Sequence, residues 1–303
     1  MKNWIQYLIY ISILFLLIYL KQHRYIDIPR INSYGYLGFS IILLFVGFIS
    51  TSLTWTAVLR KSKIYIDYKQ SISSVGLYIF AKYIPGKVWV ILGKSGYVAK
   101  KSKISIHSLS TVALNEQFLL LWTGLTIGAF GLFLIKGLNV WGGSVALCWL
   151  ILTAVIFTNI FHDFTNILLI KLGKTNINIP KLSFLDVVRV IPWFILTWIS
   201  WCFAFYFFAR SIAGYDVPLS IGPGFALGTT LGVMSLFTPG GLGVREGILT
   251  VYLLLAGIDT QDAATIAIAS RIWFLVGECL IFCLGILLDR LAKNQVPPAE
   301  PGV

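Results

Sequence analysis

Acidic side chains are scarce in this sequence, which has 12 Asp and Glu among its 303 residues against 24 Lys and Arg. Charged residues of both signs make up only 12%, whereas a soluble domain carries roughly 25%, so the composition excludes a soluble protein. Hydrophobic residues reach 57%, as expected of a chain that crosses a membrane several times. The longest polar interval, residues 162–186, is too short to fold as a separate soluble domain.

Histidine and cysteine are also rare, which leaves little material for a metal site. The three histidines, at positions 23, 107 and 162, lack the spacing of metal ligands. The four cysteines lie inside apolar runs, where buried packing is expected rather than a disulfide or a metal site: Cys148, Cys202, Cys279 and Cys283. We therefore expect neither a metal nor a cofactor.

Catalytic motifs are missing as well. The sequence has no Gly-x-Ser-x-Gly motif and no paired aspartates typical of a polyprenyl-sugar glycosyltransferase. Gly93-Lys94-Ser95 ends like an ATP-binding P-loop, but six residues separate it from the preceding Gly86, where the motif has four. The protein is therefore expected not to be an enzyme.

The net charge of +12 does not indicate nucleic-acid binding, because the basic residues lie in short loops between apolar runs. Such loops are typical of the cytoplasmic side of a membrane protein. The first apolar run resembles a signal peptide, yet the bulky segment at residues 19–22 follows it in place of a cleavage site. It is predicted to remain as the first span.

Six apolar runs have the length of about 17–25 residues that a membrane-spanning helix needs. These predicted spans are Trp4–Leu20, Tyr34–Leu59, His107–Ile135, Val140–Phe161, Val187–Phe208 and Gln261–Leu288. Two further apolar segments, Ser71–Val98 and Gly222–Gly257, are interrupted near the middle by Pro-Gly. Such a break frees backbone polar groups that lipid cannot satisfy, so it survives at membrane depth only inside protein or beside a polar cavity.

The two interruptions are YIPGKVW at residues 83–89 and TPGGLGVREG at residues 238–247. Their predicted turn residues are Pro85, Gly86, Pro239, Gly240, Gly241 and Gly243. Gly240 and Gly241 are expected to need positive φ or a close approach of the backbone. Paired broken segments in the two halves of a transporter are the best sequence indication of its binding site.

The distribution of Lys and Arg indicates whether each broken segment crosses the membrane or turns back. With two re-entrant hairpins and a cytoplasmic N-terminus, fourteen basic residues lie inside and five outside; with two crossings, the numbers are nine and ten. Cytoplasmic loops carry the excess of positive charge, so hairpins are favoured. The sequence thus predicts an all-α integral membrane protein of six full spans and two re-entrant Pro-Gly helical hairpins. We expect it to lie in the cytoplasmic (inner) membrane with both termini cytoplasmic.

This topology is an inverted repeat within a single membrane domain, residues 1–293. The repeats cover about residues 1–136 and 140–290, and residues 294–303 form a flexible tail. The spacing agrees in the two halves, since Pro85 precedes Glu116 by 31 residues and Pro239 precedes Arg271 by 32. Inverted repeats with discontinuous helices are a recurrent transporter plan. Chance similarity between two hydrophobic halves is the alternative.

Eight charged residues fall within or against the apolar segments, where a central charge costs at least about 2.5–3.5 kcal/mol and usually faces a cavity or a partner. Lys94 is one of them. The other seven, with Tyr83, are the candidate substrate-binding residues: Lys82, Tyr83, Lys87, Glu116, Arg245, Glu246, Arg271 and Glu278. Structural ion pairs that hold the bundle together are the alternative, most of all for Lys94 and Glu278.

The positions of these charges suggest how they meet. Glu116 and Arg271 occupy matching places in the two repeats, so a pair between them near the pseudo-twofold axis is one arrangement. Arg271 and Glu278 are seven residues apart and share a helix face. Arg245 and Glu246 open the half-helix behind the second turn, where free N–H groups and the helix dipole favour an anion. Such a basic lining suits a phosphate-bearing headgroup.

These motifs carry a resemblance to a known family. YIPGKVW, Glu116 on the next span, PGGLGVREG and Arg271 on the last span resemble the lysylphosphatidylglycerol synthase transmembrane-region family, over nearly the whole chain. The resemblance implies lipid translocation across a bacterial or archaeal cytoplasmic membrane. The soluble aminoacyl-transferase domain of the synthase is missing after the last span, so lysyl transfer is not expected. Gln117 stands where the family more often has Arg, which weakens an ion-pair role for Glu116.

The favoured function is a flippase or scramblase-like carrier of a polar lipid, either a phospholipid or a polyprenyl-phosphate glycan. Glu116 and Glu278 are the candidate proton sites. Membrane lipids are the expected partners, with a glycosyltransferase or lipid synthase as a further one. The alternative function is a non-catalytic accessory subunit of a glycan or lipid synthase. The charges distinguish the two, because an accessory scaffold has little reason to keep Arg245, Glu246 and Arg271.

Overall fold

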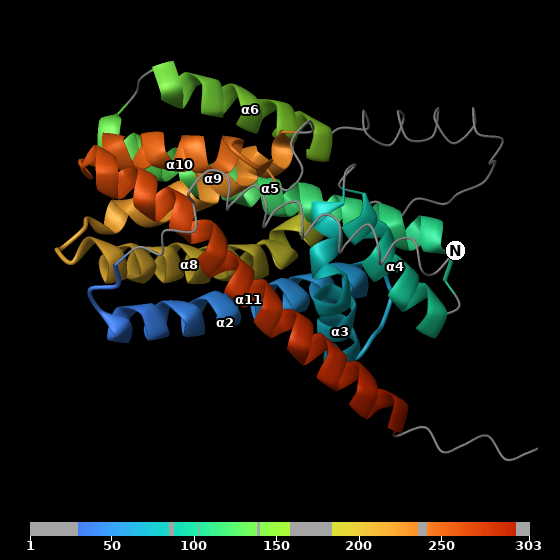
Figure 1. The fold of residues 1–303 in the computed structure, drawn as a ribbon. Helices are drawn as coiled ribbons and strands as arrows, with labels where there is room; N and C mark the ends of the chain where they lie inside the picture. Colours follow the sequence, from blue (N-terminus) through green and yellow to red (C-terminus); the bar gives the residue numbers. More distant parts are fainter. Residues whose placement is uncertain are drawn as a thin grey trace, which may run out of the picture.

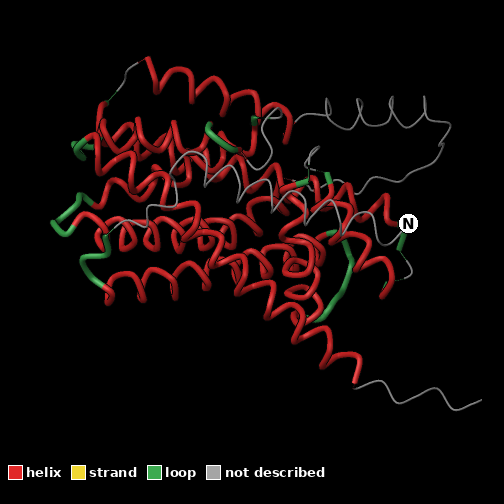
Figure 2. Tube along the Cα trace, viewed as in Figure 1, coloured by secondary structure: helices red, strands yellow, loops and turns green. Residues whose placement is uncertain are grey.

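Helices make up all the regular structure in the residues that the computed structural model describes, which are 30–84, 88–102, 104–137, 140–157, 184–235 and 241–294. Figure 2 shows these helices joined by loops, with no strand among the described residues. The all-α prediction is confirmed for this part of the chain. Several predicted features lie outside it: the span Trp4–Leu20, the site residue Lys87, the tail, and the turn residues Pro85, Gly86, Pro239 and Gly240.

Four helices are long and apolar enough to cross a membrane among the described residues, and each matches a predicted span. They are α2 (Tyr34–Lys61), α5 (Ile106–Lys136), α8 (Phe184–Ala213) and α11 (Thr260–Asn294). A fifth helix, α6 (Val140–Phe157), covers the described part of the predicted span Val140–Phe161. The chain is therefore a multi-pass membrane protein.

Local sequence explains where the long helices begin and end. The Ser33 hydroxyl accepts a hydrogen bond from the Tyr36 N–H at 3.4 Å and caps α2. Ser105 caps α5 in the same way through the Ser108 N–H at 3.2 Å. At its far end α5 stops at Gly137, whose φ of +62° breaks the helix.

An aromatic core joins α2, α8 and α11. Phe48 of α2 lies 5.3 Å from Trp201 of α8 and 4.9 Å from Phe274 of α11, measured between ring centroids. Trp273 stacks on Phe208 at 4.9 Å. Because these rings are buried and interlocked, they fix the rotation of α11 about its axis, and with it the direction of the charged side chains that α11 carries.

The two interrupted segments fold as short helices. The first gives α3 (Tyr68–Tyr78), the 3₁₀ turn η1 (Ile79–Tyr83) and α4 (Trp89–Lys101). The second gives η2 (Leu219–Ile221), α9 (Gly222–Met234) and α10 (Val244–Leu255). The α-helices have 11 to 13 residues, about 16–20 Å at 1.5 Å per residue, so none spans a hydrocarbon core of about 30 Å.

Glycine lets α9 and α10 pack side by side in opposite directions. Gly224, Gly228 and Gly232 of α9 face Tyr252, Leu249 and Arg245 of α10 in turn. An added Cβ at Gly232 would lie 2.9 Å from the Arg245 Cβ, and one at Gly228 would lie 3.2 Å from the Arg245 carbonyl oxygen. Small residues at this spacing are how helices approach closely in membranes.

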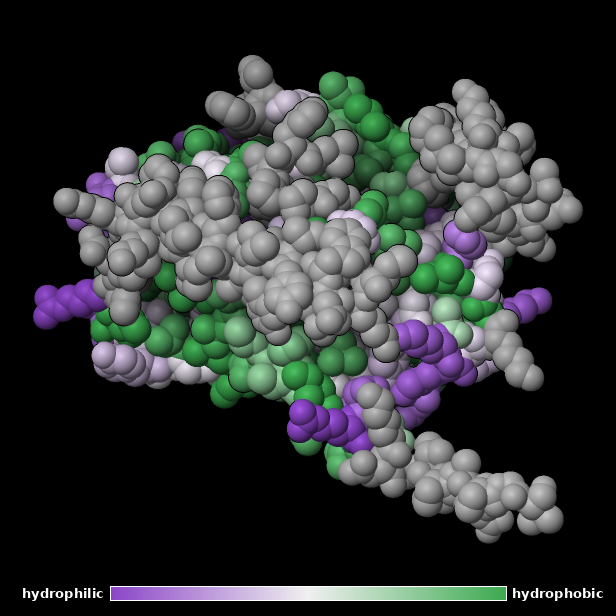
Figure 3. All heavy atoms as spheres, turned by 45° about the vertical axis from the view of Figure 1, so that its right-hand side comes forward, coloured by the Kyte–Doolittle hydropathy of each residue, from purple (hydrophilic) through white to green (hydrophobic). Residues whose placement is uncertain are grey.

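The helices form an elongated bundle. In Figure 1, α2, α5, α8, α9 and α10 run roughly along its length, α11 crosses them obliquely, α6 lies along one edge, and α3 and α4 lie at one end. In Figure 3, hydrophobic side chains make up most of the coloured surface between the two ends, and hydrophilic ones gather at the left tip and toward the lower right. This distribution is expected of a protein whose surface between the two ends is surrounded by lipid.

The close contact between α9 and α10 gives a test of the packing. Gly232→Ala should lower the melting temperature of the purified protein, because its Cβ has no room and overpacking typically costs about 1–3 kcal/mol. Gly247→Ala on α10 is the matched control, since nothing lies within 4 Å of its Cβ position. Alanine is the better helix former, so the control should be neutral or stabilising. Equal melting of the two variants would contradict the packing.

Candidate functional site

The two interrupted segments meet on α11. Tyr83, at the end of η1, packs with Leu242, which precedes α10, and with Leu275 of α11. Around this contact lie Lys82 of η1, Arg245 and Glu246 of α10, and Arg271 and Glu278 of α11, which are five of the predicted site residues. We call these five charged residues and Tyr83 the charged cluster.

Glu278 anchors one side of the charged cluster and is fully buried. Its carboxylate forms an ion pair with Lys82 and accepts a hydrogen bond of 2.8 Å from the Tyr83 hydroxyl. The Lys82 ammonium also lies 4.9 Å from the ring centroid of Phe274. Glu278 therefore ties η1, at the interruption of the first segment, to α11. The cation–π contact between Lys82 and Phe274 strengthens the same link.

Glu246 holds the other side of the charged cluster. One carboxylate oxygen accepts the Gly243 N–H at 2.8 Å, which caps α10, and the other accepts Nη1 of Arg271 at 3.1 Å. The Arg271 guanidinium lies 5.8 Å from the Tyr83 ring centroid. A carboxylate thus occupies the N-terminal end of α10, where free N–H groups and the helix dipole favour negative charge.

Arg245 is buried between aromatic rings. Its guanidinium carbon lies 4.9 Å from the ring centroid of Phe225 and 5.1 Å from that of Phe274. Nη2 donates to the Ser270 hydroxyl at 3.3 Å and to the Ser270 carbonyl at 3.4 Å. Nε is buried with no hydrogen-bond partner among the described residues. Arg245 is therefore placed by stacking and by neutral oxygens.

Phe225, Phe274 and Ser270 were not predicted as site residues. Aromatic residues are common throughout the chain, so sequence alone gives no reason to select these two rings. Ser270 directly precedes Arg271, and that adjacency is the signal that points to it. The arrangement as a whole offers guanidinium and ammonium donors to an anion.

Lys94 and Glu116 form a second buried ion pair, between α4 and α5. The Lys94 ammonium also lies 4.4 Å from the ring centroid of Trp55 on α2. The sequence left open whether Glu116 pairs with Arg271. In the structure Glu116 pairs with Lys94 because α4 packs on α5, and Arg271 pairs with Glu246 because α10 packs on α11.

The turn glycines follow the predicted backbone where they are described. Gly241 has φ of +72° and Gly243 has φ of +80°. A Cβ at Gly241 would also lie 2.7 Å from the Gly232 carbonyl oxygen, so this residue combines positive φ with close approach. The expectation for Gly241 is confirmed, and Gly240 lies outside the described residues.

The cysteines are less buried than expected. Cys202 is buried and Cys148 half-buried, but Cys279 and Cys283 are exposed on α11. The prediction of buried packing is wrong for these two, because an apolar run in a membrane protein faces lipid as well as the core. Among the described residues, no group of three His, Cys, Asp or Glu could hold a metal ion.

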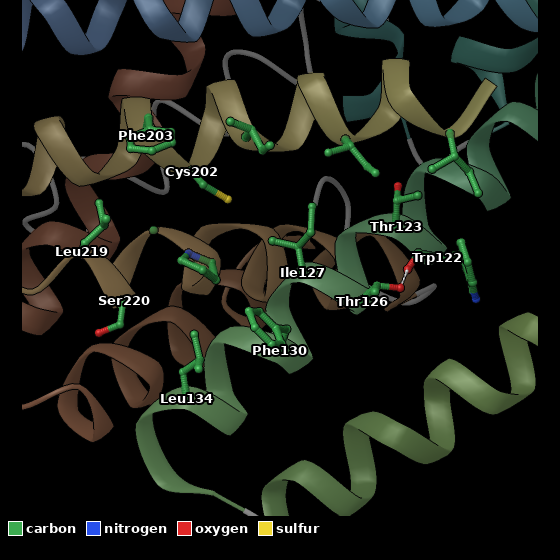
Figure 4. Close-up of a pocket in the computed structure, with 15 residues that line it drawn as sticks. Trp122, Thr123, Thr126, Ile127, Phe130, Leu134, Cys202, Phe203, Leu219 and Ser220 are labelled. Carbon is green, nitrogen blue, oxygen red and sulfur yellow. Dashed lines mark hydrogen bonds between the residues drawn. The ribbon is translucent and has the colours of Figure 1, made fainter. Parts of the chain in front are cut away.

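A pocket of about 660 Å³ lies apart from the charged cluster, between α5, α8 and the start of α9. Figure 4 shows Thr126, Ile127 and Phe130 of α5 across from Cys202 of α8. Its lining is almost entirely apolar and includes no charged residue. Such a cavity suits hydrocarbon rather than a polar headgroup.

The family comparison agrees with this architecture. The model of the family described as "Lysylphosphatidylglycerol synthase TM region" matches residues 3–277 of the chain. The chain belongs to this family. Membership and the apolar helices together fit a membrane protein concerned with lipids. A search of the curated proteins gave no match.

The second ion pair gives a stability test. Glu116→Leu should destabilise the protein by about 3–5 kcal/mol, because it leaves the Lys94 ammonium buried without its carboxylate. The double variant Lys94→Met, Glu116→Leu should recover most of that loss, since an apolar pair of similar volume is often neutral or better. The measurement is the melting temperature of purified protein. The control is Lys101→Met, whose pair with Asp289 is more exposed and should matter little.

Proposed function

We propose that this protein is a flippase or scramblase-like carrier that moves a polar lipid across the cytoplasmic membrane. The observation that carries the proposal is the charged cluster, in which residues beside the interruptions of the two apolar segments meet on α11. Buried charges within membrane segments usually mark a substrate or ion pathway. The cluster offers donors for a lipid phosphate, while the hydrocarbon tails remain in lipid.

Re-entrant hairpins in the proposed topology account for the short helices. The two helices on either side of each Pro-Gly break pack against each other, α3 against α4 and α9 against α10. The glycine contacts show that α9 and α10 are antiparallel. A segment that crossed the membrane once would place its two halves end to end instead. The proposed orientation has both hairpins returning to the side from which they enter, with both termini cytoplasmic.

An inverted repeat is supported by the packing of the two halves. Taking α2, α3, α4 and α5 as equivalents of α8, α9, α10 and α11, the starts of matched helices differ by 150 to 155 residues. The contacts recur as well: α3 packs on α11 as α9 packs on α5, and α4 packs on α5 as α10 packs on α11. The helix α2 packs on its own equivalent, α8, as expected near a pseudo-twofold axis.

In this proposal the protein binds and moves lipid without chemical change and is not an enzyme. Its partners are membrane lipids, either phospholipids or polyprenyl-phosphate glycans, and a synthase or glycosyltransferase that supplies them. The alternative is a non-catalytic accessory subunit of such a synthase. The charged cluster favours transport, because a structural role does not require three cations around the meeting point of two broken helices.

Transport can be tested by mutation of the arginines. In liposomes with labelled lipids, Arg271→Ala and Arg245→Ala should each reduce leaflet exchange at least about tenfold, because one phosphate contact is lost in apolar surroundings. Arg271→Lys should recover only part, since an ammonium cannot make bidentate contacts with phosphate. Protein abundance in the membrane is measured alongside. If both alanine variants exchange lipid at the wild-type rate, the charged cluster is not the transport site and the accessory-subunit function is favoured.

Topology can be tested by cysteine labelling. In a variant without the four native cysteines, Ser102→Cys and Thr175→Cys should both react with a membrane-impermeant reagent only from the cytoplasmic side. Both positions lie in Lys-rich stretches that the re-entrant topology places inside. Labelling of either one from outside would overturn the hairpins.

A further inference from the structure

The charges of the cluster do not cancel. Among the described residues, the cluster contains three cations, Lys82, Arg245 and Arg271, and two carboxylates, Glu246 and Glu278, so it carries one net positive charge. The other buried pair, Lys94 and Glu116, is neutral by itself. Net charge in apolar surroundings is costly, and an anion of single charge would balance this cluster.

Glu246 already occupies the place that such an anion would take. Its carboxylate accepts the Gly243 N–H at the start of α10 and a guanidinium N–H of Arg271. These are the two kinds of donor that bind phosphate at helix N-termini. The buried Nε of Arg245, the residue before Glu246, has no hydrogen-bond partner among the described residues and is a further donor of the cluster.

Glu246 is also the more readily displaced of the two carboxylates. The Glu246 side chain is 17% exposed, whereas that of Glu278 is 0% exposed and is held by both Lys82 and Tyr83. A ligand phosphate could therefore replace the Glu246 carboxylate at Arg271 without breaking the link between η1 and α11.

Building on the lipid function above, we propose that the charged cluster is matched to a monoanionic phosphodiester headgroup, and that Glu246 sets this match. A dianionic phosphomonoester would leave the cluster one negative charge in excess. A zwitterionic headgroup brings its own cation and leaves the positive charge uncompensated. Glu246 is thus a specificity-determining residue, which yields its donors to the phosphate and repels a second negative charge.

Two lipid sources carry this chemistry. One is a glycerophospholipid such as phosphatidylglycerol, and the other is a prenyl phosphosugar, in which a phosphodiester joins a sugar to a prenyl chain. The test therefore uses short-chain soluble forms of both. Phosphatidic acid supplies the phosphomonoester and phosphatidylcholine supplies the zwitterion.

The experiment measures thermal stabilisation of the purified full chain by each lipid at about pH 8. For each lipid, we compare the concentration that gives half of the maximal rise in melting temperature. For wild type, this concentration should be at least about tenfold lower for phosphatidylglycerol or the prenyl phosphosugar than for the other two lipids. The source is the diester that acts at the lower concentration. Glu246→Gln removes one negative charge and should shift the preference toward phosphatidic acid. Asp216→Asn, at an exposed pair outside the cluster, should keep the wild-type order.

A second measurement covers the case in which Glu246→Gln does not fold. The second pKa of a phosphomonoester is about 6, so phosphatidic acid becomes largely monoanionic at about pH 5. For wild type, its half-stabilising concentration should then fall toward that of phosphatidylglycerol, whose charge does not change in this range. The proposal is overturned if no lipid stabilises the protein, if the lipid order ignores charge, or if the order is the same in wild type and Glu246→Gln.

Leaflet exchange measured on the same lipids separates this inference from the proposed function. If lipid binding follows headgroup charge but no lipid is exchanged between leaflets, the proposed charge match stands and the transport function is rejected. If lipids are exchanged without any dependence on headgroup charge, the transport function stands and the proposed charge match is rejected.

Discussion

A charged side chain inside a membrane cannot be left alone, and the arrangement of this protein follows from that cost. Glu278 on α11 is fully buried and binds both Lys82 and Tyr83 of η1, at the interruption of the first segment. Glu246 then ties the start of α10 to Arg271, which lies about two helical turns before Glu278 on the same helix α11. Because η1, α10 and α11 all carry charges that need partners, the interruptions of the two segments come together on α11.

Charge alone does not hold broken helices in lipid, since apolar side chains gain little there by leaving lipid for protein. Close van der Waals contact supplies the rest. The helix α9 lies between two glycine-lined contacts: its own Gly224, Gly228 and Gly232 toward α10, and the glycines of α5 at positions 124, 128 and 131. At the turn, Gly241 approaches the Gly232 carbonyl so closely that a side chain would not fit. The same residue type therefore makes the break and packs the helices on either side of it.

Sequence predicted the features that lipid dictates directly. The long spans at α2, α5, α8 and α11 were found because a bilayer demands about 20 apolar residues. The residues of the charged cluster were selected as candidates because charges stand out in apolar runs. The partner of Glu116 was not found, because it depends on the packing of α4 on α5 rather than on matching positions in two repeats. The rings beside Arg245 escaped for a related reason, since a cation–π contact is made only when α9, α10 and α11 come together. Exposure of Cys279 and Cys283 was misjudged because an apolar helix face can meet either lipid or protein.

The two halves differ where the proposed repeat makes them most comparable. On α4, Lys94 reaches across to α5 and meets the carboxylate of Glu116, which completes a neutral pair inside the protein. On α10, Arg245 lies one helical turn before the position that matches Lys94, and Ser270 on α11 occupies the position that matches Glu116. Among the described residues, the Arg245 guanidinium donates only to the neutral oxygens of Ser270. If the halves arose from one ancestral unit, the first half neutralises Lys94 with the carboxylate of Glu116, whereas the second half gives Arg245 no such carboxylate. This difference between the halves indicates that a bound anion would supply the missing negative charge at Arg245, whichever lipid carries the anion.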